Sequence, residues 1–131
     1  MAGFDWFWKA MGGKQGRNQK RSLAIVDQAA ARVAKLNARS DEDLVARARE
    51  ITASGEVADA AEFLAILSIA ATRTLEMTPF PVQLQAVLRL LEGDVIQMAT
   101  GEGKTLVGAM ANTGFGLMGK RVHSVTVNDY L

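Results

Sequence analysis

Apolar residues recur three and four positions apart across residues 22–39, at Leu23, Val26, Ala30, Val33 and Leu36. This period predicts an amphipathic helix, since positions three and four apart share one face of a helix. Ser40 is followed by three acidic residues, which is typical of a helix N-cap and first turn. We therefore expect a second helix that begins after Ser40 and ends at Gly55, because glycine is common where helices stop.

A third helix is predicted from about Val57 to the run Thr78-Pro-Phe-Pro81. Its apolar residues repeat the helical spacing, at Ala60, Leu64, Leu67 and Leu75. The helix must end at that run, because proline disfavours the helical conformation in the residue before it. We expect all three helices to form a helical region whose role is packing.

Beyond this region, predicted helices alternate with predicted strands. Residues 82–92 predict a short helix that stops at Gly93, and residues 94–99 have the length and branched apolar content of a buried strand. A helix over residues 104–118 and an alternating strand over residues 121–127 complete a β-α-β unit. The predicted fold class is therefore α/β, with a helical N-terminal region.

Composition limits the classes of protein that remain. The 131 residues fit one domain of ordinary size, and 49% hydrophobic with 22% charged residues suffices for a core and excludes wholesale disorder. The absence of cysteine excludes a disulfide scaffold and any cysteine-based metal site or nucleophile. No apolar run approaches the roughly eighteen residues of a membrane span. The N-terminal aromatic residues precede the positive charges, unlike a signal peptide, so we expect a cytoplasmic protein.

Charge divides the chain into three segments, which we take as its domains. Residues 1–21 carry five bases against Asp5, residues 22–78 are acidic on balance, and residues 79–131 hold equal numbers of acids and bases. These segments coincide with a tail, the helical region and the α/β region.

The tail combines aromatic and basic residues. Phe4, Trp6, Phe7 and Trp8 precede the basic stretch KQGRNQKR of residues 14–21. Tryptophan favours the headgroup region of a membrane, and lysine and arginine are attracted to anionic lipid, so the tail is predicted to bind an anionic lipid surface. The alternative is that its aromatic side chains dock on the body of the protein.

Residues 98–105, MATGEGKT, lie between a predicted strand and a predicted helix, which is the setting of a phosphate-binding P-loop. Gly101 and Gly103 would let the backbone turn tightly and bring its N–H groups close to phosphate oxygens. The N-terminus of the following helix would add the positive end of its dipole. The pattern thus predicts a site for the phosphates of a nucleotide.

Particular side chains of this loop have candidate roles. Lys104 is the candidate contact for the β- and γ-phosphates, and the Thr105 hydroxyl is a candidate ligand of a magnesium ion bound with ATP. Thr100 and Glu102 complete the predicted nucleotide site. We assign Glu102 no role as a general base, since such a group must reach the attacking water.

The first position of the loop departs from the strict P-loop pattern, because it is Met98 rather than glycine. Helicase-like motors often carry a non-glycine residue there and pair it with an upstream glutamine that reads adenine. Gln83 lies 21 residues before Lys104 and is the candidate, since a carboxamide can donate to and accept from the adenine edge together. Gln85 is the competing candidate.

Three stretches together resemble the first nucleotide-binding domain of the SecA family: PFPVQL of residues 79–84, GDVIQMATGEGKTL of residues 93–106, and VHSVTVNDYL of residues 122–131. TGEGKTL and VTVNDYL are the most specific of these. The second stretch and the Trp-rich start resemble the accessory SecA of actinobacteria more than the housekeeping form. Pro81 and Ser124 depart from the usual residues, an acid and a valine, and neither is a candidate phosphate ligand.

The resemblance implies a RecA-like P-loop NTPase domain, incomplete here, in an ATP- and Mg²⁺-dependent motor for bacterial protein export. It implies the Sec channel and preproteins as partners, and a location in the cytoplasm and on the cytoplasmic face of the membrane. In the family, the acidic magnesium motif would lie beyond Leu131 and a second motor domain supplies an arginine. We therefore expect an N-terminal part of a longer protein that does not hydrolyse ATP alone, with no catalytic residue assigned within it.

Two other readings compete with this one. A DEAD-box RNA helicase shares the glutamine and the P-loop, but its next motif usually reads Pro-Thr-Arg-Glu-Leu-Ala, whereas residues 126–131 read TVNDYL. We therefore expect no nucleic-acid partner. The second alternative is a non-enzymatic interaction module with an inactive P-loop.

Overall fold

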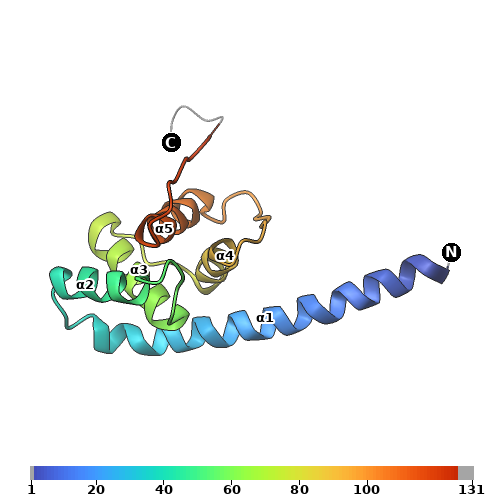
Figure 1. Ribbon diagram of the computed structural model, residues 1–131, viewed down its shortest axis with the longest axis horizontal. Helices are drawn as coiled ribbons and strands as arrows, with labels where there is room; N and C mark the ends of the chain where they lie inside the picture. Colours follow the sequence, from blue (N-terminus) through green and yellow to red (C-terminus); the bar gives the residue numbers. More distant parts are fainter. Residues whose placement is uncertain (1, 127–131) are drawn as a thin grey trace.

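The computed structural model describes the backbone of residues 2–126 and the side chains of residues 17–126. The described chain contains five α-helices, and Figure 1 shows them as one long helix with four shorter ones gathered along its C-terminal half. The last position of the predicted second strand and the NDYL part of the C-terminal motif lie outside the described residues.

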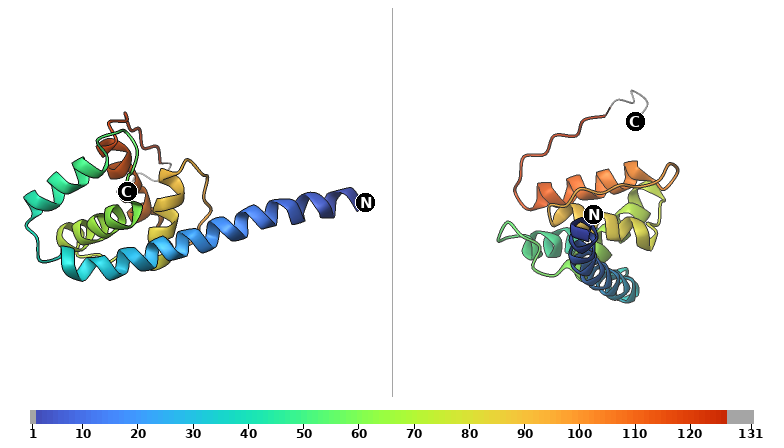
Figure 2. Two further views of the ribbon diagram at one scale, coloured as in Figure 1. Left: turned by 60° about the horizontal axis from the view of Figure 1, so that its bottom comes forward. Right: turned by 90° about the vertical axis from the view of Figure 1, so that its right-hand side faces the viewer.

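The first helix, α1 (Ala2–Leu36), begins well before the predicted start at residue 22 and crosses the expected boundary at residue 21. Its N-terminal half extends away from the other helices (Figures 1 and 2). Residues 12–16 contain three glycines, which have low helix propensity. A helix once nucleated adds residues at little cost, however, so propagation from the packed half outweighs the low helix propensity of these positions.

The ends of α2 (Asp41–Ile51) and α3 (Ala60–Leu75) are fixed by side-chain caps. The predicted N-cap Ser40 is confirmed, since its hydroxyl oxygen accepts from the Asp43 N–H at 3.2 Å. Asp59 caps α3 in the same way, accepting from the Glu62 N–H at 3.0 Å. Each cap satisfies a backbone donor that the first turn of a helix leaves unpaired, which sets where these helices begin.

Helix α3 is the centre of the core, and it contacts α1, α2 and α4. Its side chains are buried in several directions, including Phe63, Leu64 and Ala65, which are at most 1% exposed. A helix that is apolar nearly all round must be surrounded, as Figures 1 and 2 show for α3. The predicted packing role of this region is therefore confirmed.

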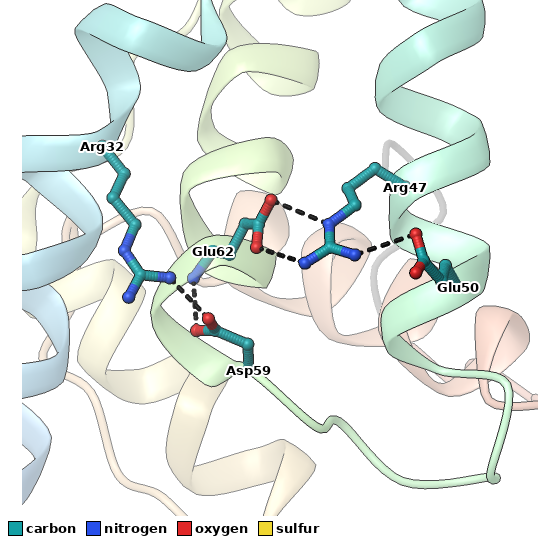
Figure 3. Close-up of polar contacts among 5 residues, drawn as sticks. All are labelled: Arg32, Arg47, Glu50, Asp59 and Glu62. Atoms are coloured by element: carbon teal, nitrogen blue, oxygen red, sulfur yellow. Dashed lines mark hydrogen bonds and ion pairs between the residues drawn. The ribbon is translucent and has the colours of Figure 1, made fainter.

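Arginine–carboxylate pairs join the first three helices on one side of the core (Figure 3). Arg47 of α2 donates from Nε and Nη2 to the two carboxylate oxygens of Glu62 at 2.9 Å each, and its Nη1 lies 2.8 Å from Glu50. Arg32 of α1 donates to Asp59 at 2.6 Å. Figure 3 shows that Asp59 and Glu62, which lie side by side at the start of α3, receive arginines from two different helices.

These contacts shift ionisation. The hydrogen bond from Arg47 lowers the pKa of Glu62 below its usual range, and Glu62 in turn raises the pKa of Arg47. Burial opposes ionisation of Asp59, but hydrogen bonds from the Glu62 N–H and from Arg32 leave the pKa of Asp59 below its usual range. Both carboxylates are therefore charged in the folded protein above pH ~4, where unperturbed carboxyl groups titrate.

Helices α4 (Pro81–Leu91) and α5 (Lys104–Leu117) pack against each other and close the structure above α3. Gly114 permits this approach, because a Cβ there would lie 2.6 Å from Leu91 Cδ2 and 3.3 Å from Phe63 Cε1. The buried Thr52 hydroxyl lies 3.1 Å from the Leu117 carbonyl oxygen and so connects the end of α2 to the end of α5.

The predicted strands over residues 94–99 and 121–127 are not formed in the described part of the chain, and the predicted α/β class is therefore not confirmed. The described architecture is helical. Residues 94–99 arch between α4 and α5, and residues 121–126 run away from the helices as a single segment (Figures 1 and 2). A strand requires a hydrogen-bonded neighbour, and the side chains of Val95 and Val125 are 99% and 92% exposed. The branched residues of these segments predicted strands, but composition does not show whether a neighbouring strand is present.

Among the residues described, no helix combines the length and apolar content needed to cross a membrane.

Candidate phosphate-binding loop

The glycine-rich loop between α4 and α5 is a turn followed at once by a helix. The Glu102 N–H donates to the Ala99 carbonyl oxygen at 3.3 Å, and Gly101, at the third position of the turn, has φ 84°. Gly103 has φ 75° and is the N-cap of α5. Residues other than glycine rarely adopt such positive φ values, which explains why the loop needs glycine at both positions.

The start of α5 presents a row of backbone donors. Gly103 offers no side chain to cap the helix, and the first turn contains no acidic residue. The N–H groups of the first helical turn cannot bond within the helix. Within the described residues the N–H of Gly103 also makes no hydrogen bond. Four successive donors, from residue 103 to residue 106, therefore stand at the positive end of the helix dipole, a geometry that suits a phosphate group.

Lys104 and Thr105 extend from this helix start with exposed side chains, and Thr100 and Gly101 are exposed beside them in the loop. The fold therefore brings together the loop residues that the sequence predicted for a nucleotide site. The row of donors, the mobile ammonium of Lys104 and the absence of a competing acid in the first turn fit a triphosphate. Thr105 lies next to Lys104 in the first turn of α5, and a hydroxyl oxygen is a ligand type that magnesium accepts.

Gln83, the upstream candidate, lies in the first turn of α4 and is 5% exposed. Its Oε1 accepts from the Phe80 N–H at 2.8 Å, and its Nε2 donates to the Glu102 carbonyl oxygen at 2.9 Å. The structure therefore joins Gln83 to the glycine-rich loop, as the sequence spacing suggested. A carboxamide has two donor hydrogens and two acceptor lone pairs, so one of each remains. Gln85 is half-buried, and within the described part of the chain its side chain makes no hydrogen bond to the loop.

The role of Glu102 inside the loop could not be predicted from the sequence pattern. Its carboxylate Oε2 accepts from the Ala99 N–H at 3.0 Å, so the side chain closes the turn from within. The Phe80 contact was missed as well, although a glutamine three residues after a helix N-cap is the signal for it.

One cavity lies beside the loop, and a larger one lies elsewhere in the structure. One of about 420 Å³ is lined by Lys104 and by apolar residues that include Leu90, Ile96 and Met98. A larger one, of about 650 Å³, lies among α1, α3 and α4 and contains none of the predicted phosphate-site residues. The convergent backbone donors lie at the loop, so the loop is the candidate phosphate site. Among the described residues, no three histidine, cysteine, aspartate or glutamate side chains are grouped to hold a metal ion.

Comparison with known proteins gives a consistent family. The model of the SecA DEAD-like domain matches residues 7–131. Protein translocase subunit SecA 2 of Corynebacterium efficiens is 72% identical over the whole chain, which spans 17% of that relative's length. SecA 2 of Corynebacterium glutamicum is 68% identical over the whole chain and likewise is covered over 17% of its length. Protein translocase subunit SecA 3 of Mycolicibacterium vanbaalenii is 50% identical over 95% of this chain and 16% of its own.

Proposed function

Because the chain belongs to the SecA family, we propose that its glycine-rich loop binds the triphosphate of ATP, in a protein that uses ATP to drive protein export. The observation that carries this proposal is the row of N–H donors at the start of α5 beside Lys104. The residues matched by the family model include the whole loop. The similarity to SecA 2 proteins favours an accessory rather than a housekeeping member.

Each side chain of the site has a proposed role. The ammonium of Lys104 neutralises charge on the β- and γ-phosphates, and the hydroxyl of Thr105 helps to hold the magnesium ion that accompanies them. Bound magnesium neutralises phosphate charge. The backbone of Thr100, Gly101, Glu102 and Gly103 forms the loop around the phosphates. Gln83 uses its remaining donor and acceptor to read the adenine edge, which separates ATP from GTP.

We propose that the two extended segments become strands of a RecA-like sheet. Their composition is that of buried strands, and the side chains of Val95 and Val125 are exposed, as expected where a sheet and its covering layer are not formed. By resemblance to the family, the acidic motif that holds magnesium and polarises water lies outside residues 1–131. We therefore expect no ATP turnover from residues 1–131 alone, and we expect the full-length protein to be the ATPase.

The proposed partners are a Sec channel at the cytoplasmic face of the membrane and the preproteins that pass through it. The similar proteins from Corynebacterium are protein translocase subunits, which supports this proposal. ATP-driven movement of a preprotein into inverted membrane vesicles by the full-length protein tests it. If ATP is hydrolysed but no preprotein becomes protected from added protease inside the vesicles, the protein is an ATPase without the proposed role in export.

We further propose that residues 1–21 bind the anionic lipid of that membrane. Two observations support this: the aromatic and basic composition of the segment, and the course of α1 away from the other helices (Figure 1). Each lysine or arginine near an anionic surface adds about 1 kcal/mol, so binding is reversible and is weakened by salt.

Vesicle co-sedimentation tests the lipid proposal. Deleting residues 1–16 is the sharper variant, because Arg21 donates to Glu92 at 2.8 Å and belongs to the folded body. The intact protein should sediment with anionic vesicles at low salt, and the shortened protein should not. Equal sedimentation of both would remove the lipid role from this segment.

A further inference from the structure

We infer that Gln83 is a positioning residue for the phosphate-binding loop, beyond its proposed reading of adenine. The inference rests on the proposed function, because it concerns how the same loop is held ready for phosphate. It arises from a contact between two segments that are distant in sequence, the first turn of α4 and the glycine-rich loop.

Both ends of the Gln83 carboxamide are held. Oε1 accepts from the Phe80 N–H at 2.8 Å, and Nε2 donates to the Glu102 carbonyl oxygen at 2.9 Å. The side chain is 5% exposed, so these bonds form with little competition from water. Because α4 packs on α5 and α1, the carboxamide is a fixed support on which the loop rests.

The bond to Glu102 has a direct effect on a phosphate donor. Glu102 and Gly103 share one peptide unit, and no cis peptide occurs in the described chain. In a trans peptide the C=O and the N–H point in opposite directions. By holding the Glu102 carbonyl toward α4, Gln83 therefore directs the Gly103 N–H away from α4. This N–H makes no hydrogen bond within the described residues and is the first of the four donors at the start of α5.

A second observation concerns the space between Gln83 and Gly103. A Cβ added at Gly103 would lie 2.2 Å from Gln83 Nε2, well inside the closest approach of real atoms. Gln83 therefore occupies the space that a side chain at residue 103 would need. Residue 103 therefore has to be glycine for two reasons: it leaves room for the Gln83 side chain, and it can adopt the positive φ of the loop.

These contacts predict an effect that adenine recognition alone does not. If Gln83 only reads the base, its loss leaves the affinity for a triphosphate without a base unchanged. If Gln83 positions the loop, its loss weakens that affinity too. One lost hydrogen bond of this kind corresponds to a change of about 3- to 10-fold in affinity.

The test uses the full-length protein and inorganic tripolyphosphate as the probe, with binding followed by displacement of a fluorescent ATP analogue. Gln83→Met keeps the length of the side chain and removes both hydrogen bonds without adding charge. Gln83→Glu retains an acceptor for the Phe80 N–H and removes only the donor to Glu102. Gln85→Met and Gln85→Glu are the matched controls, because Gln85 lies on the same helix two residues away. Thermal unfolding of each variant checks the fold.

The inference predicts that both Gln83 variants bind tripolyphosphate about 3- to 10-fold more weakly, while the Gln85 variants stay within twofold of the unchanged protein. Unchanged affinity in Gln83→Met overturns the inference and leaves the proposed function intact. A loss confined to Gln83→Glu would assign the effect to its charge and also overturns it. If neither ATP nor tripolyphosphate displaces the analogue from the unchanged protein, the proposed function itself is wrong.

Discussion

The helical body of α1–α3 and the nucleotide region of α4, α5 and the adjoining segments differ in how their backbones are satisfied. In the body each helix bonds its own backbone, and side chains such as Arg47 and Glu62 then join one helix to another. In the region of α4 and α5, the donors at the start of α5 and the backbone groups of residues 95–98 and 121–125 have no such partners among the described residues.

This difference teaches that unsatisfied backbone in one chain can have two meanings. At the start of α5 the free donors are gathered at one point beside Lys104, and a ligand can use them all. Along residues 95–98 and 121–125 the unpaired backbone groups are spread out, and the side chains of Val95 and Val125 are exposed, so these groups suit pairing with another strand. The first arrangement indicates a binding site and the second indicates a sheet edge.

The largest expected effect is on the nucleotide region. Lys104→Ala in the full-length protein should weaken ATP binding roughly 10- to 100-fold, because a charge-assisted hydrogen bond contributes about 1.5–3 kcal/mol. ATP turnover should be abolished. Titration with ATP and a phosphate-release assay measure the two effects. Lys120→Ala is the control, since Lys120 lies beyond the other end of α5 over the Phe115 ring, and it should change neither. Normal turnover in Lys104→Ala would remove this residue from the site.

Substitution of two glycines of α5 should act in opposite directions. Gly114→Ala inserts a methyl group 2.6 Å from Leu91 and should lower the free energy of unfolding by about 1–3 kcal/mol. Gly116→Ala meets no atom within 4 Å and should raise it by up to about 1 kcal/mol, since alanine favours a helix over glycine. Denaturant unfolding compares them. Equal changes in both variants would show that α4 and α5 do not approach through Gly114.

In the helical body, the pair of Arg47 and Glu62 should show a measurable stabilising coupling in a double-mutant cycle, using Arg47→Met and Glu62→Gln. The pair has bidentate geometry, and only 15% of the Glu62 side chain is exposed. The exposed pair of Arg21 and Glu92 is the comparison, and it should give less than half of that coupling, because 62% of the Arg21 side chain is exposed. Similar values for both pairs would contradict a special role for the Arg47 pair.

The smallest expected effect is a dependence of stability on acid pH. The pKa values of Asp59 and Glu62 are lowered in the folded protein, so their contribution is fully present above their unfolded pKa values of ~4. It is lost as pH falls through the lower folded values. Thermal unfolding between pH 6 and pH 3, roughly this window, should show a smaller decline in the double variant Asp59→Asn and Glu62→Gln than in the unchanged protein. An equal decline would place the acid sensitivity elsewhere.

The sequence predicted local features well and paired features poorly, for a physical reason. The cap at Ser40 and the start of a helix at Lys104 depend on residues close in sequence, and the structure contains both. The strands depend on hydrogen-bonded neighbours, which no composition of residues 94–99 could reveal. The same limit applies to the site. The loop could be predicted from its glycines. The hydrogen bond from Gln83 to the Glu102 carbonyl oxygen joins two separate elements, so only the structure could reveal it.

The start of α1 shows the opposite case, in which local composition predicted a break that the helix does not have. The change in charge after residue 21 predicted a separate tail, but the backbone continues as one helix through residue 21. Helix propagation depends on the neighbouring turn, so local composition underestimated it. The role of the segment at a lipid surface stays a prediction.

Hydrogen exchange of the backbone amides of residues 101–106 tests the central claim most directly, because it reports on the donors themselves. In the full-length protein with Mg²⁺ present, ATP should slow exchange at residues 103–106, while residues 41–51 of α2 should be unaffected. Lys104→Ala should reduce that protection at the same ATP concentration. If saturating ATP leaves exchange at residues 103–106 unchanged, the loop does not hold the triphosphate and the account is wrong.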